Sequence, residues 1–180
     1  MSQQNLLPHK VDAFRFSENA IAIQGKLQIQ AMPRLSAFLK EASGEVDVEM
    51  AFDVDEQGVY FVKGLFSTHL MLQCQRCLEL FRYALKGEFL SGLVHTEEEI
   101  EQLPKSYDSI IVKEGEDLIL QDIIEDELIV NLPIVPMHNL KDCKVKLPLT
   151  IESSDTRETR DENPFKVIEL LRTKKRNTNE

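Results

Sequence analysis

Two cysteines separated by two residues are the first candidates for chemistry in this 180-residue sequence. Cys74 and Cys77 have the spacing at which two thiolates can bind one zinc ion, as in a zinc knuckle. His138 and Cys143, further along the chain, could complete a tetrahedral set of four ligands. An alternative interpretation treats the cysteines as small apolar residues in a turn. A thioredoxin-like redox site is less favoured, because it needs a helix N-terminus beside the thiol, whereas this motif joins two expected strands.

Two groups of basic residues could contact nucleic-acid phosphates. The first is a strip of Arg76, Arg82 and Lys86, which also fits an ordinary solvated sheet face. The second group ends the chain's last predicted helix, where positive charge also stabilises a helix C-terminus through its dipole. Its members are Arg172, Lys174, Lys175 and Arg176.

The acidic residues are concentrated in one stretch. Between Glu97 and Glu127 there are twelve acidic and two basic residues, which equals the whole net charge of −10. A nucleic-acid contact is therefore possible only through a local basic patch. Glu125 and Asp126 precede Glu127 on one helix and point in different directions, which disfavours a two-metal nuclease site. We expect most of this group to be solvated, with Glu127 closest to a buried partner, and the acidic surface could meet a basic protein.

Alternating apolar residues predict the strands that would carry the cysteine pair. Residues 21–29, 45–55, 59–74 and 80–94 have the period of two that is typical of half-buried strands. Their short linkers allow only sequential hairpins, hence an antiparallel meander. Gly64 could mark a bulge. A helix is expected from Pro33 to a stop at Gly44.

The second half of the chain predicts helices more than strands. We expect an acidic helical turn near residue 97, a short strand over 108–112, and an amphipathic helix over 117–132 that Asp117 caps and Pro133 ends. The fold class is thus α+β, with residues 1–140 as a single domain. Residues 141–162 read as a polar, flexible linker and residues 163–180 as a basic C-terminal helix.

Three motifs resemble one known family. They are LQCQRCLELF over 72–81, LPKSYDSIIVKEGEDLILQDIIEDELIVNLPIVPMH over 103–138, and NPFKVIELLRTKK over 163–175. Together they are similar to the YceD family, the large ribosomal RNA subunit accumulation proteins. The resemblance implies a role in accumulation or processing of 23S ribosomal RNA in the bacterial cytoplasm, in a family without an established catalytic activity. Some YceD-like proteins carry extra cysteines where this chain has only His138 and Cys143.

We therefore expect a cytoplasmic, non-catalytic ribosome biogenesis factor. The sequence begins without an export signal, and its three cysteines suit reduced thiols or a metal site. The expected partner is 23S ribosomal RNA, its precursor or a large-subunit ribosomal protein, with no membrane and no DNA, and zinc is the one cofactor considered. The alternatives are a metal-dependent RNA-processing enzyme and a protein adaptor. His9, His69 and His95 suggest no nucleophilic site.

Overall fold

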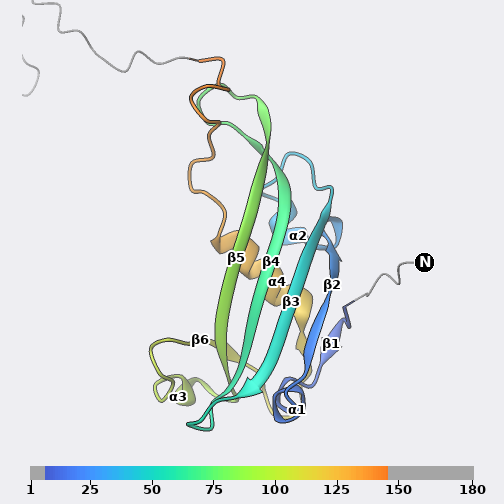
Figure 1. Cartoon of the computed structure of the whole chain (residues 1–180), viewed down its shortest axis with the longest axis vertical. Helices are drawn as coiled ribbons and strands as arrows, with labels where there is room; N and C mark the ends of the chain where they lie inside the picture. Colours follow the sequence, from blue (N-terminus) through green and yellow to red (C-terminus); the bar gives the residue numbers. More distant parts are fainter. Residues whose placement is uncertain (1–6, 146–180) are drawn as a thin grey trace, which may run out of the picture. The chain divides into compact units, whose positions relative to one another are not determined.

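A five-stranded sheet forms the body of the protein in the computed structural model, which describes residues 7–145 (Figure 1). Neighbouring strands follow one another in sequence order across the sheet. They are β2 (Ala22–Gln28), β3 (Glu45–Val54), β4 (Tyr60–Gln73), β5 (Leu80–Val94) and β6 (Asp108–Ile111). The first four pair antiparallel, as predicted, and the α+β fold class is confirmed.

The fifth strand, β6, pairs parallel to β5, with Ser91 opposite Asp108 and Val94 opposite Ile111. A parallel neighbour needs a crossover of about a dozen residues or more. Residues 95–107 supply it and include α3 (Glu97–Ile100), the expected acidic turn. Strand β6 is an edge strand of the sheet, and it lies within the acidic stretch of the chain.

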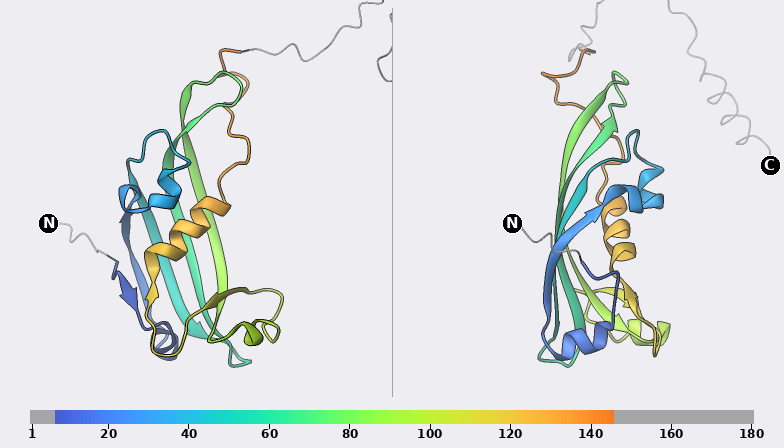
Figure 2. Two further views of the ribbon diagram at one scale, coloured as in Figure 1. Left: turned by 180° about the vertical axis from the view of Figure 1, so that it is seen from behind. Right: turned by 90° about the vertical axis from the view of Figure 1, so that its right-hand side faces the viewer.

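One face of the sheet is covered by helices and the other is open (Figure 2). The alternation in β3 follows the prediction, because four of its apolar side chains are at most 2% exposed while its acidic side chains face outward. The four are Val46, Val48, Met50 and Phe52. Helix α4 (Leu120–Val130) lies across the inner face and buries the apolar stripe that its sequence predicted. This packing is favourable because it removes apolar surface from water. That stripe consists of Leu120, Ile123, Ile124 and Leu128.

Two predicted helix boundaries are wrong. Helix α2 spans only Pro33–Ser36, after the 3₁₀ turn η1 (Ile29–Ala31), and the chain turns back so that Ile29 N–H donates to the carbonyl of Gly44 at 3.0 Å. Gly44 has φ +121°, a left-handed conformation that favours glycine. Helix α4 begins at Leu120, and Asp117 does not cap it, because residues 118–119 pair as a strand instead.

That pairing forms a second, two-stranded sheet from β1 (Lys10–Val11) and β7 (Leu118–Ile119). Strand β1 leads into α1 (Ala13–Glu18), which the sequence reading missed. Asp12 was the available signal: its side chain caps α1 by accepting from the N–H of Arg15 at 3.0 Å. These elements attach the start of the described chain to the start of α4.

The predicted bulge at Gly64 is also wrong. The register is unbroken there, with Gly64 opposite Met50 on one side and Phe89 on the other. A Cβ on Gly64 would lie 2.1 Å from the Phe89 ring, so glycine makes room for that ring. Gly87 makes room for Phe66 in the same way, at 2.3 Å. The two glycines therefore let large aromatic rings fill the inner face of β4 and β5.

The predicted linker beyond residue 145 and the predicted basic helix over 163–180 lie outside the described residues. Across residues 7–145, no helix has the length and apolar character needed to cross a membrane.

Candidate metal centre

The β4–β5 hairpin ends in a tight loop that carries the cysteine pair. The N–H of Cys74 donates to the carbonyl of Glu79 at 2.9 Å, and the N–H of Leu78 donates to the carbonyl of Cys74 at 2.8 Å. These bonds fold residues 74–79 back on themselves, so that Cys74 and Cys77 lie together. The cysteines thus occupy one tip of the long hairpin (Figure 1).

The chain that leaves α4 runs to the same tip (Figure 1). The N–H of Gln75 donates to the carbonyl of Pro136 at 2.9 Å, which joins the two segments through their backbones. The imidazole of His138 packs on the ring of Phe81, with the ring centroids 4.7 Å apart. Pro133 ends α4 near the predicted place, and the exit segment then delivers His138 and Cys143 to the hairpin.

The four predicted ligands come together. The sulfur atoms of Cys74, Cys77 and Cys143 and a ring nitrogen of His138 all lie within 4.8 Å of one another. Cys77 Sγ lies 3.3 Å from His138 Nδ1, and the three cysteines are free thiols. Zinc bonds of about 2.0–2.3 Å in a tetrahedron separate the ligand atoms by about 3.3–3.8 Å. Three thiols and one imidazole at this spacing fit a zinc ion, and small side-chain shifts would complete the tetrahedron.

The electrostatics of the loop suit a cation. Burial opposes ionisation of Cys74, but N–H groups of His138, Cys77 and Arg76 together lower its pKa to about 5. The backbone N–H of Glu79 favours the Cys77 thiolate, yet burial and the neighbouring Cys74 and Cys143 sulfurs raise the pKa of Cys77. One thiolate is therefore already favoured and hinders the ionisation of its neighbour. A bound cation would relieve that repulsion.

Arg76 was predicted to lie on an exposed basic strip, but its side chain points to the candidate metal ligands. Its Nε donates to Cys143 Sγ at 3.1 Å, and its guanidinium also donates to the carbonyl of His138 at 2.9 Å. Arg82 and Lys86, the other members of the predicted strip, lie exposed on the outer face of β5. Arg76 therefore contacts two of the candidate metal ligands, whereas Arg82 and Lys86 face solvent. The four basic residues of the predicted C-terminal helix lie outside the described residues.

The acidic triplet on α4 also differs from expectation. Glu125, rather than Glu127, is the buried member: it is 1% exposed, and its carboxylate accepts from Leu35 N–H at 2.9 Å and from Arg34 Nε at 3.1 Å. Arg34 also pairs with Asp126. The prediction that Glu125 is exposed to solvent is therefore wrong, because its buried carboxylate joins α4 to α2.

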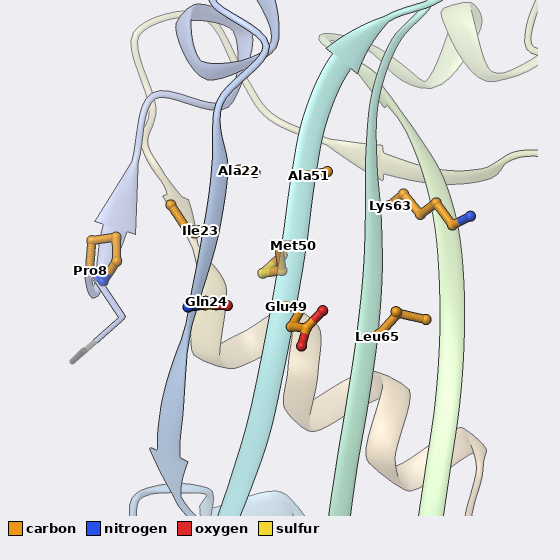
Figure 3. Close-up of a pocket in the computed structure, with 9 residues that line it drawn as sticks. All are labelled: Pro8, Ala22, Ile23, Gln24, Glu49, Met50, Ala51, Lys63 and Leu65. Atoms are coloured by element: carbon orange, nitrogen blue, oxygen red, sulfur yellow. The ribbon is translucent and has the colours of Figure 1, made fainter. Parts of the chain in front are cut away.

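A hollow of about 650 Å³ lies on the open side of the sheet, over β2, β3 and β4 (Figure 3). Glu49 and Lys63 are its only charged lining residues, and most of the other lining residues are apolar or small. The hollow therefore presents no cluster of nucleophilic or metal-binding groups.

Comparisons with known proteins match nearly the whole chain. A family model described as "Large ribosomal RNA subunit accumulation protein YceD" matches residues 62–172, a span that includes all four candidate ligands. A protein of that name from Haemophilus influenzae is 30% identical over 173 residues, covering 96% of this chain and 99% of the relative. No solved structure shows a significant match. The three sequence motifs and these two matches agree, and the chain belongs to the YceD family.

Proposed function

We propose that the protein is a non-catalytic factor of the bacterial cytoplasm that supports the accumulation of 23S ribosomal RNA. The observation that carries the proposal is the similarity to the Haemophilus influenzae protein, which covers both chains almost from end to end. Such coverage supports the same role because it leaves no large segment of either protein unmatched.

A structural zinc ion at the hairpin tip is part of the proposal. Cys74, Cys77, His138 and Cys143 would hold it, and the ion would cross-link the β4–β5 loop to the exit from α4. Four protein ligands fill a tetrahedral zinc site and leave no position for substrate or water, which is typical of structural rather than catalytic zinc.

The hairpin tip is the part of the described chain best suited to RNA. Residues 69–86 and 138–145 together carry five basic and two acidic residues, in a protein of net charge −10. Arg82 and Lys86 offer exposed cations for phosphates, and Leu78, at 65% exposed, offers an apolar surface beside them. Zinc knuckles contact unpaired RNA with surfaces of this kind. The tip is therefore where we place the RNA contact.

The test is to incubate the full chain with precursor 23S RNA and divalent metal and to follow both binding and RNA length. We expect a complex with intact RNA. Cleavage with turnover would favour a metal-dependent RNA-processing enzyme instead. Binding of ribosomal protein together with an absence of RNA crosslinks in cells would favour a protein adaptor.

A further inference from the structure

Strand β6 lies toward the end of the sheet away from the hairpin tip (Figure 1). A groove of about 520 Å³ lies between this edge strand and helix α4. Carboxylates from β6, from the approach to β7 and from α4 line it, and no lysine, arginine or histidine does. Among the described residues, only Asp126 of these carboxylates forms an ion pair. The six are Asp108, Glu116, Asp117, Asp122, Asp126 and Glu127.

The carboxylates repel one another. Burial raises the pKa of Glu127, and the neighbouring charges of Asp108 and Asp126 raise it further. Folding has therefore gathered like charges from three consecutive elements around one groove, and most of them have no cationic partner among the described residues. A cationic partner would gain attraction from all of these groups at once.

The free edge of the sheet indicates that the partner is an extended peptide. Strand β6 pairs with β5 along one edge and, within residues 7–145, with no strand along the other. A strand edge carries backbone donors and acceptors, and an added strand satisfies them.

We propose that this groove binds an extended segment of a partner protein, rich in lysine and arginine, which adds to the free edge of β6. The backbone of the segment would pair with β6, and its cationic side chains would reach the carboxylates of α4 and of the β7 approach. RNA is the wrong occupant, since its phosphates would meet the same repulsion. The inference does not rest on the proposed function, because the groove and the hairpin tip share no residue.

The test uses the full chain and a ten-residue peptide of alternating lysine and valine at physiological salt. The triple variant Asp108→Asn, Asp122→Asn, Glu127→Gln should weaken binding by at least about tenfold. A matched variant, Glu97→Gln, Glu101→Gln, Glu114→Gln, removes the same charge from exposed positions outside the groove and should weaken binding by less than about twofold. Equal losses in the two variants would mean that only net charge attracts the peptide and would overturn the proposal.

Nuclear magnetic resonance distinguishes the mode of binding. Amide shifts should concentrate on residues 108–112 and on the start of α4, and a helical lysine–alanine peptide of equal charge should bind at least about fivefold more weakly. Equal binding of the helical peptide would reject strand addition.

The chain's own basic end is the other possible occupant. If changing Arg172, Lys174, Lys175 and Arg176 to glutamine tightened peptide binding severalfold, the groove would belong to that segment and the proposal of a separate partner would fail.

Discussion

The two ends of the molecule treat their polar groups in opposite ways. At the hairpin tip, Cys77, His138 and Cys143 come from distant parts of the chain, and Arg76 donates to two of these residues. At the β6 end, six carboxylates line one groove, but most have no partner among the described residues. At the tip, the polar groups contact one another, whereas most carboxylates of the groove contact no charged partner within residues 7–145.

Charge follows the same division. The tip is locally basic, and the stretch from Glu97 to Glu127 contains the whole net negative charge of the protein. The strands β4 and β5, with 14 and 15 residues, keep the two regions apart. An acidic protein can therefore approach a polyanion with its tip first, because its repulsive end points away.

The strongest test of the tip is removal of two ligands. Protein purified without chelator should contain close to one equivalent of zinc, and Cys74→Ser with Cys77→Ser should lose it and lower the thermal midpoint by more than about 5 °C, because a structural site couples metal binding to folding. Metal analysis and calorimetry measure both effects. His69→Ala, an exposed change on the strand that precedes the cysteine loop, is the control and should alter neither. Wild type that is metal-free and fully folded would reject the zinc site.

The next largest effect concerns Glu125, the buried carboxylate of the acidic stretch. Glu125→Ala removes the acceptor of the buried Leu35 N–H and a partner of Arg34, and should cost about 2–3 kcal/mol in the free energy of unfolding. Glu114→Ala, at an exposed position nearby in sequence, should cost less than about 0.5 kcal/mol. Urea unfolding compares them. Equal costs would mean that Glu125 belongs with the solvated carboxylates after all.

Arg76 and Arg82 can be separated by metal affinity. Because Arg76 donates to Cys143 Sγ and to the carbonyl of His138, Arg76→Gln should weaken zinc binding about tenfold. Arg82→Gln should leave zinc binding unchanged, since Arg82 lies on the outer face of β5. Competition with a chromophoric chelator gives both affinities. If the two variants bind zinc alike, Arg76 does not position the ligands.

The smallest expected effect is on RNA affinity. Arg82→Gln with Lys86→Gln should weaken binding of precursor RNA and flatten its salt dependence by up to about two units, nearly one for each lost phosphate contact. The quadruple change at residues 172–176 should flatten it further if the C-terminal cations also contact phosphate. Lys113→Gln, within the acidic stretch, is the control. Slopes that match wild type in both variants would place the RNA contact elsewhere.

The sequence predicted the features that depend on local pattern. The alternation of β3 identified its buried face, and the Cys-x-x-Cys spacing with His138 and Cys143 identified four residues that the structure brings together. It could not predict features that depend on how elements pack. The burial of Glu125 requires α2 to lie against α4, and the groove requires β6 to run parallel to β5. Neither relation leaves a local periodicity, so both sites became visible only in the fold.

The most direct test of the account is the ratio of large- to small-subunit ribosomal RNA in cells from which the gene has been removed. The account predicts a fall in this ratio, restored by the wild-type chain and restored only in part by the chain with Cys74→Ser and Cys77→Ser. An unchanged ratio in conditions where the protein is abundant would contradict the central claim, whatever the hairpin tip binds.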